Sequence, residues 1–353
     1  MKKNIERGIG MFGDVTFDPK TNLPLQTMED RLGEIIEQIK LADELGVDIF
    51  SAGEHHRPDY AIASPEILLA ALSTVTKNIT LASGVSVISS TDPVKLYQDF
   101  ATVDLLSHGR AEIIAWRWSF IESFPLFGYD LQDYWELFTE KLDLLLQINK
   151  TEHLTWSGKY RAPIHHQNIL PRALNNRELP IRIAVGGTPE SVLRAAKLGL
   201  PIIFAIIGGM REHFIPMIEM YKEEYIKHGH SIHDMQIWAH MHTFVVDDEQ
   251  DLINRYFPLY KYQMDRIGSS RGRSEYSLDQ FQGGMSPQWA LCMGNWEQVA
   301  NKIAMIVKEL GLTRFVAHMD IGGPAHDDML RSIDLYARDI IPALNDYLSK
   351  AKQ

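Results

Sequence analysis

Short apolar runs alternate with longer amphipathic stretches along the whole chain, and this alternation limits the fold more than any other sequence feature. Eight runs have the length and the apolar or β-branched content of buried strands. In order, these runs cover residues 8–12, 47–52, 79–88, 111–115, 181–185, 201–207, 236–246 and 314–321. Because the stretches between them are long enough for helical crossovers, the strands are predicted to be parallel.

The amphipathic stretches predict helices that follow each strand. They cover residues 28–45, 65–75, 93–106, 134–148, 189–198, 211–228, 251–267, 296–310 and 327–344. Three of these helices begin with a capping residue and then proline, at Ser64-Pro65, Asp92-Pro93 and Thr188-Pro189. Eight strand–helix units favour an α/β fold of the (β/α)8 TIM-barrel type, and an open doubly wound sheet is the alternative.

Two segments interrupt the alternation after strands four and seven, at about 151–180 and 268–295. We interpret both as insertions into a single barrel domain that covers residues 1–353, because neither segment resembles a separate domain. Long connections of this kind are often lids or interface segments. We expect both insertions to form walls of a substrate site, with apolar side chains at Trp156, Phe281, Met285 and Trp289.

Length and charge exclude several classes of partner. A chain of 353 residues is within the range of one barrel with insertions. The net charge of −11 argues against binding to nucleic acid or to an anionic membrane surface. No apolar window approaches a membrane span, no signal peptide precedes the first strand, and Cys292 is the only cysteine. These features predict a cytoplasmic protein.

The strongest candidate for chemistry is Glu54-His55-His56, at the carboxyl end of the second predicted strand. An imidazole beside a carboxylate can donate or accept protons near neutral pH. A solvated histidine pair is the inert alternative. A metal site is the weakest of the three interpretations, because adjacent side chains diverge and no HExxH pattern is present.

A second candidate is the turn after the fifth predicted strand, which reads Gly186-Gly187-Thr188-Pro189-Glu190-Ser191. Gly187 lets the backbone approach a ligand, and the helix that follows directs unpaired N–H groups toward it. Thr188 and Ser191 can both donate hydroxyl groups to a phosphate, with Arg117 as the opposing charge. An ordinary tight connection with a capping threonine is an equal alternative.

Further candidates lie on the third, seventh and eighth predicted strands. Gly84 indicates a close backbone approach near the end of the third strand, although a long strand would also explain it. His240 and His242 alternate along the seventh strand and therefore face the same side, as His318 does on the eighth. We regard these histidines as secondary pocket candidates.

Taken together and in this order, several segments of the chain resemble the bacterial-luciferase-like superfamily of flavin-dependent oxidoreductases. The matching segments are 46–48 leading into 53–56, then 89–93, 105–112, 119–128, 186–191 and 319–323. The resemblance runs nearly end to end. It implies a (β/α)8 barrel that binds FMN at the carboxyl end of its strands.

The resemblance also implies roles for individual residues. His55 matches a catalytic base near the flavin, with Glu54 beside it. The Gly84–Val85 bond matches a non-prolyl cis peptide that packs behind the isoalloxazine. The positions that match phosphate-binding residues are Arg117, Gly187, Thr188 and Ser191.

The implied chemistry is oxygenation of a small organic substrate by reduced FMN and O2, or hydride transfer from the flavin. A separate flavin reductase would supply the reduced FMN, and the chain would form a homodimer. One departure from the pattern concerns the cofactor, because the chain has Trp116-Arg117-Trp118-Ser119 where this branch reads Gly-Arg-Gly-Ser. The competing interpretations are a deazaflavin-dependent enzyme and a non-catalytic barrel in which Trp116 and Trp118 fill the flavin site.

Overall fold

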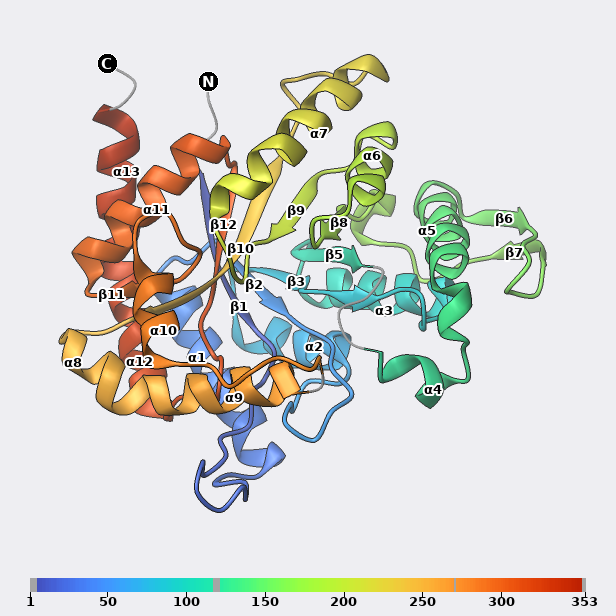
Figure 1. Ribbon diagram of the computed structural model, residues 1–353. Helices are drawn as coiled ribbons and strands as arrows, with labels where there is room; N and C mark the ends of the chain where they lie inside the picture. The colour runs from blue at the N-terminus through green and yellow to red at the C-terminus, as the bar shows by residue number, and fades with distance from the viewer. Residues whose placement is uncertain (1–4, 117–120, 270, 351–353) are drawn as a thin grey trace.

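The computed structural model describes residues 5–116, 121–269 and 271–350. In this part of the chain, eight parallel strands form a barrel surrounded by helices (Figure 1). The barrel strands are β1 (Glu6–Met11), β2 (Ile49–Ala52), β3 (Thr80–Ser83), β5 (Ala111–Trp116), β8 (Ile181–Val185), β9 (Ile202–Ala205), β10 (Ile237–Val245) and β12 (Arg314–His318). The pairings β9–β10, β10–β12 and β12–β1 close the sheet. The predicted TIM barrel is therefore confirmed, and the open doubly wound sheet is wrong.

The helices follow the predicted pattern closely, and their first turns show why they begin where they do. The long helices are α1 (Met28–Glu44), α2 (Pro65–Val75), α3 (Pro93–Leu106), α5 (Tyr134–Lys150), α6 (Pro189–Lys197), α7 (Ile215–Lys227), α9 (Phe257–Ser269), α11 (Trp296–Leu310), α12 (His326–Leu335) and α13 (Ile341–Lys350). Thr27 and Asn295 form capping boxes at α1 and α11, and Asp92 caps α3. Ser64 and Thr188 occupy the same position at α2 and α6 without a side-chain capping bond.

Shorter elements fill the connections. They are β4 (Ser86–Val87), α4 (Ser123–Phe127), η1 (Leu131–Asp133), β6 (His153–Trp156), β7 (Ile164–Asn168), η2 (Leu174–Asn176), η3 (Arg211–Phe214), α8 (Glu249–Asp251), η4 (Leu252–Tyr256), α10 (Leu278–Met285), β11 (Cys292–Gly294) and η5 (Tyr336–Ile340). The strand predicted over 79–88 divides into β3 and β4, and the Gly84–Val85 peptide between them is cis, as the resemblance implied. The helices predicted over 251–267 and 327–344 each contain a π-helical segment, η4 and η5.

The first insertion folds on the outside of the barrel. Residues 151–180 contain the antiparallel hairpin β6–β7, which lies beyond α5 on the outside of the barrel (Figure 1). The Trp156 indole N–H donates a hydrogen bond to Asp143 of α5 over 3.4 Å. Because this segment connects a helix to the next strand, it starts and ends at the amino end of the barrel. None of its residues lines either cavity at the carboxyl end of the strands, although Arg161 contacts Asp92 at the start of α3, so its part in a substrate site stays a prediction.

The second insertion belongs to the opposite end of the barrel. Residues 268–295 begin at the end of α9 and precede α11, so they are part of the connection from β10 to its outer helix. The segment contributes Arg271 and Arg273 to a cavity at the carboxyl end of the strands. Its aromatic side chain at Phe281 is buried in the core, whereas Trp289 is 42% exposed. The insertion thus lines the cavity as expected, but through two arginines, and none of the expected apolar side chains at Phe281, Met285 and Trp289 is part of the lining.

Inside the barrel, the amino end is filled by a buried ionic cluster. Glu112 of β5 accepts hydrogen bonds from Arg182 over 3.2 Å and from Arg314 over 2.8 Å. Both guanidinium groups lie over the indole ring of Trp238, with centroid distances of 4.5 Å and 3.4 Å. Burial alone would raise the pKa of Glu112, but Arg314 and Arg182 lower it below the ordinary value. This cluster closes the bottom of the barrel.

Two glycines near the middle of the barrel leave room for larger side chains at the carboxyl end. A Cβ atom at Gly10 would lie 2.6 Å from Cε1 of His240, and one at Gly53 would lie 2.1 Å from Cδ1 of Phe12. Glycine at these positions thus admits an imidazole and a phenyl ring into the barrel interior.

Among the described residues, no helix combines the length and the apolar content needed to cross a membrane.

Candidate active site

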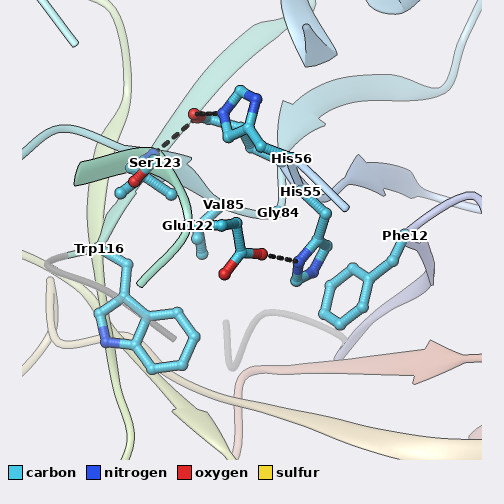
Figure 2. Close-up of a pocket in the computed structure, with 10 residues that line it drawn as sticks. Phe12, His55, His56, Gly84, Val85, Trp116, Glu122 and Ser123 are labelled. Carbon is cyan, nitrogen blue, oxygen red and sulfur yellow. Dashed lines mark hydrogen bonds and ion pairs between the residues drawn. The ribbon is translucent and has the colours of Figure 1, made fainter. Parts of the chain in front are cut away.

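Two cavities adjoin each other at the carboxyl end of the barrel. The smaller one, of about 30 Å³, has room for about one water molecule. It is lined by Phe12, Glu54, His55, His56, Gly84, Val85, Val87, Trp116, Glu122 and Ser123 (Figure 2). The larger one has a volume of about 440 Å³. Trp116 lines both, so its indole lies along the boundary between the two cavities.

His55 forms the inner wall of the smaller cavity. Its ring is only 5% exposed and stacks on Tyr60, with a centroid distance of 4.2 Å. The Phe12 ring lies 4.5 Å away on another side. Burial lowers the pKa of His55, and the nearby Glu122 carboxylate opposes that shift only in part. His55 is therefore a neutral imidazole near pH 7, which is the form that accepts a proton.

The carboxylate beside His55 is not the one that the sequence suggested. Glu54 lines the cavity, but one oxygen accepts the Val87 N–H over 2.8 Å and the other contacts Nε2 of His56 at 2.9 Å. Glu122 instead faces His55, with its Oε1 atom 4.0 Å from Nδ1 of the imidazole (Figure 2). Glu54 thus holds the β3–β4 turn, and Glu122 supplies the acidic neighbour of the candidate base.

Glu122 was missed because its segment gave no periodic signal. It lies just before α4, in the connection between β5 and α5, where neither strand nor helix periodicity is present. The sequence signal that could have identified it is an acidic residue in the loop after a barrel strand, because these loops build the active face of such barrels.

The larger cavity is mostly apolar, with a few polar groups at its edges. Its inner surface comes from inward-facing residues of the strands, among them Ile114, Ala184, Ile203 and Val316. His240 and His242 line it from β10, while Arg271 and Arg273 reach it from the second insertion. An apolar cavity of several hundred Å³ with a few convergent polar groups is typical of a small-molecule site.

The β8–α6 turn adjoins this cavity through Gly186, which lines it. Gly187 has φ +112°, a conformation that favours glycine, and Thr188 takes the N-cap position of α6. The hydroxyl groups of Thr188 and Ser191 lie 2.9 Å apart at the first turn of the helix. The structure thus brings together the hydroxyl pair that the sequence suggested for a phosphate, beside the larger cavity.

The remaining sequence candidates at this site have different outcomes. Gly84 and Val85 line both cavities. Arg117 and Trp118 lie outside the described residues. Trp116 does not fill the larger cavity, because that volume remains beside its indole. A Cβ atom at Gly186 would lie 3.4 Å from Cζ2 of Trp116, so the indole rests on the β8–α6 turn.

A buried charged cluster lies behind the larger cavity. Asp14, His318 and Asp320 place one possible metal-ligand atom each within 4.8 Å of one another. However, the Asp320 carboxylate already accepts hydrogen bonds from the backbone N–H groups of residues 12, 13 and 14 and from Arg31. The Arg31 guanidinium supplies the positive charge that a metal would bring. The cluster therefore fits an internal ion pair better than a metal centre.

Comparison with protein families identifies the chain. The family model described as luciferase-like monooxygenase matches residues 14–314. The chain belongs to the luciferase-like monooxygenase family. Most residues of the candidate site, among them His55, Glu122 and Thr188, lie within the matched range.

Two curated relatives illustrate the range of similarity within the luciferase-like family. An uncharacterized protein, y4vJ, from Sinorhizobium fredii is 24% identical over 328 residues, covering 90% of this chain and 93% of the relative. N-acetyl-S-alkylcysteine monooxygenase from Bacillus subtilis is 30% identical over 191 residues, covering 53% of this chain and 55% of the relative. The second match spans only about half of each protein.

Solved structures of luciferase-like enzymes share the fold. Monooxygenase RslO1 from Streptomyces bottropensis has a TM-score of 0.81 and 20% identity, over 96% of this chain and 99% of its own. The oxygenating component of 3,6-diketocamphane monooxygenase from Pseudomonas putida, in complex with FMN, has a TM-score of 0.74 and 17% identity, over 96% and 98%. An F420-dependent secondary alcohol dehydrogenase also has a TM-score of 0.74, with 16% identity, over 97% and 99%.

Proposed function

We propose that this protein is a flavin-dependent monooxygenase that uses reduced FMN and O2 to oxidise a small organic substrate. The observation that carries the proposal is the neutral, buried imidazole of His55, at the boundary of an apolar cavity of about 440 Å³ at the carboxyl end of the barrel. Membership in the luciferase-like family supports the reaction class. The complex of a fold relative with FMN supports the choice of cofactor.

The residues of this site fit the parts of an FMN molecule. The apolar inner surface of the larger cavity suits a flat aromatic ring, and Gly84 and Val85 lie on its wall. The paired hydroxyl groups of Thr188 and Ser191, with the N-terminus of α6 and Gly187, suit a phosphate. Arg117 is our further candidate for the phosphate. Bound reduced FMN supplies the electrons that activate O2.

The chain itself contributes proton handling and exclusion of water. His55 accepts a proton at the edge of the smaller cavity, and Glu122 stabilises the imidazolium that results. We keep Glu54 in the site as the residue that fixes the β3–β4 turn through Val87. The space beside His55 holds about one water molecule, so the base works in a nearly dry environment.

Two other functions compete with this one. A deazaflavin-dependent oxidoreductase is favoured by the likeness to the F420-dependent dehydrogenase. A barrel that has lost flavin binding is favoured by the indole of Trp116 at the cavity.

For the monooxygenase, we further propose a separate flavin reductase as the source of reduced FMN, a homodimer as the assembly, and the cytoplasm as the location.

Cofactor titration separates these functions. We expect the fluorescence of added FMN to be quenched as it binds with micromolar affinity. Tighter binding of F420 than of FMN would instead support the deazaflavin enzyme. Indifference to both cofactors, together with recovery of FMN binding in Trp116→Gly, would support the barrel that has lost its flavin.

A variant of the base tests the assignment of His55. With FMN, NADH, a flavin reductase and an N-acetyl-S-alkylcysteine as a trial substrate, His55→Ala should lower turnover by about 10²- to 10⁴-fold. Flavin affinity should remain nearly intact. A large loss of affinity instead would make His55 a binding residue, and His56→Ala serves as the neighbouring control.

A further inference from the structure

Three side chains form a line from the core of the protein to the wall of the larger cavity. Nε2 of His240 lies 2.6 Å from Nδ1 of His318, and Nε2 of His318 lies 3.2 Å from Oδ1 of Asp320. His318 and Asp320 are fully buried. His240 lines the cavity, so the outer end of the line is open to a ligand.

The inner end of the line is a carboxylate held in its charged form. Asp320 accepts backbone N–H groups from residues 12–14 and a hydrogen bond from Arg31 over 3.1 Å. Burial alone would raise the pKa of Asp320, but His318, Arg31 and the Phe12 N–H together hold it below the usual range. The neighbouring Asp14 is opposite in character, because burial and the charge of Asp320 raise its pKa.

This arrangement favours one placement of the protons on the two imidazoles. The ionised Asp320 carboxylate, 3.2 Å from Nε2 of His318, attracts a proton to that nitrogen, and a neutral His318 then has Nδ1 as an acceptor. His240 must then donate from Nε2 to His318. Its own Nδ1 atom consequently carries a lone pair, and none of the described residues donates a hydrogen bond to that atom.

We propose that His240 is a second proton-accepting residue of this cavity, and that His318 and Asp320 are positioning residues that aim its Nδ1 lone pair at the ligand. The ligand group that it would bind is a hydrogen-bond donor, an N–H or an O–H. The proposal rests on the proposed function only in placing the ligand in the same cavity. Burial and the two neighbouring imidazoles keep the pKa of His240 well below its ordinary value, so the ring is neutral when the ligand arrives.

The proton balance of the step is simple. The ligand gives its proton to Nδ1 of His240 and becomes an anion, while the proton on Nε2 of His240 passes to Nδ1 of His318. His318 then carries protons on both nitrogens and becomes a cation beside the Asp320 carboxylate. The positive charge is therefore stored one ring deeper than the atom that accepted the proton.

Other ionisable side chains surround this line. Among the described residues, those that pack against it or line the same cavity include Asp14 after β1, Arg31 of α1, His55, Asp59 and Tyr60 after β2, His242 of β10, Tyr256 of η4, Tyr260 of α9, and Arg271 and Arg273 of the second insertion. His242 lies on the same side of β10 as His240, but its Nδ1 atom is 2.9 Å from the Tyr260 hydroxyl and it does not join the line. Burial first, and then His318, lower the pKa of His242 to about 3. It therefore makes a matched control.

The proton positions can be measured in the full chain without any ligand, by NMR of protein labelled with ¹⁵N in its histidine rings. We expect His240 to carry its ring proton on Nε2, with Nδ1 unprotonated. In His318→Gln, the fixed tautomer of His240 should give way to a mixture, whereas His242→Gln should leave it unchanged. A doubly protonated His318 in the wild type, or a proton on Nδ1 of His240, would overturn the proposal whatever cofactor the protein uses.

Proton acceptance can be tested with 4-nitrophenol, an O–H donor whose anion is visible by its absorbance. The wild-type cavity should raise the ionised fraction of the bound phenol above that in buffer at the same pH. His240→Gln and His318→Gln should each lower the ratio of anion to neutral phenol by about ten-fold, which corresponds to one pKa unit of the probe. Equal spectra in His240→Gln and wild type, or failure of the wild type to bind or ionise the probe, would refute proton acceptance by His240.

Discussion

At the amino end of the barrel, Glu112 lies between two guanidinium groups, whereas at the carboxyl end His240 faces a cavity of about 440 Å³. Both ends place ionisable and aromatic side chains inside the same ring of strands. At the amino end both oxygens of the carboxylate are occupied by neighbouring arginines. At the carboxyl end an imidazole keeps one nitrogen available. The difference separates groups that stabilise the barrel from groups that serve a ligand.

The largest effect that would test this comparison is at the amino end. Glu112→Gln leaves the buried Arg182 guanidinium without its carboxylate partner and leaves Arg314 with Glu6 alone, which should lower the free energy of unfolding by about 3 to 5 kcal/mol. Flavin affinity of the folded protein should not change. Urea unfolding and FMN titration check the two parts, and Asp334→Asn, on an exposed ion pair with Arg338, is the control. A large change in affinity would remove the distinction between the two ends.

The Glu112 cluster also predicts how the stability of the fold depends on pH. The folded-state pKa of Glu112 is below its ordinary value, so its stabilising contribution is complete above the unfolded pKa of about 4.3 and is lost as the pH falls through the folded pKa. Wild-type stability should therefore fall more steeply than that of Glu112→Gln below about pH 4.5. Parallel stability curves from pH 6 to 3 would contradict the assignment.

At the carboxyl end, we expect a smaller effect, and we expect it on ligand affinity instead of on stability. Thr188→Val combined with Ser191→Ala removes two hydroxyl groups offered to a phosphate, and a typical hydrogen bond makes a net contribution of about 0.5 to 1.5 kcal/mol. FMN affinity should fall about 10- to 100-fold, while riboflavin, which has no phosphate, should bind with unchanged affinity. An equal loss for both ligands would show that the turn acts through the shape of the cavity.

The two insertions give the smallest predicted effects and the finest test. Arg273→Ala removes a charge at the rim of the larger cavity and should weaken binding of FMN by roughly five-fold or less, with the difference shrinking at high salt. His166→Ala, on the outer hairpin, should change affinity by less than about two-fold, since its segment lies beyond α5. Titration at two salt concentrations measures both. An effect of His166→Ala equal to that of Arg273→Ala would contradict the placement of the hairpin.

Much of the fold was predictable because each barrel strand is an apolar run of its own. The runs that became β1, β2 and β12, for example, are separated by helices whose caps are visible in the sequence at Thr27 and Asn295. The position of the hairpin at 151–180 was also readable in principle. A segment that joins a barrel helix to the next strand must begin and end at the amino end of the barrel. Its apolar residues suggested a substrate site instead.

The candidate site was less predictable because its contacts depend on register and on loops. His240 and His318 were visible as inward-facing residues, but their pairing depends on the β10–β12 register, which sets His240 beside Val316 and His242 beside His318. Glu122 reaches His55 from a distant connection whose path no periodic pattern describes. Glu54 was favoured by adjacency alone, and adjacent residues point in different directions.

The phenyl ring of Phe12 touches His55 on one side and His318 on the other, with ring centroids 4.5 Å and 4.1 Å apart. A phenyl ring carries no exchangeable hydrogen, so it cannot pass a proton from one imidazole to the other. A proton that passes between the two imidazoles must therefore travel around this ring, through whatever ligand or water occupies the adjoining cavities.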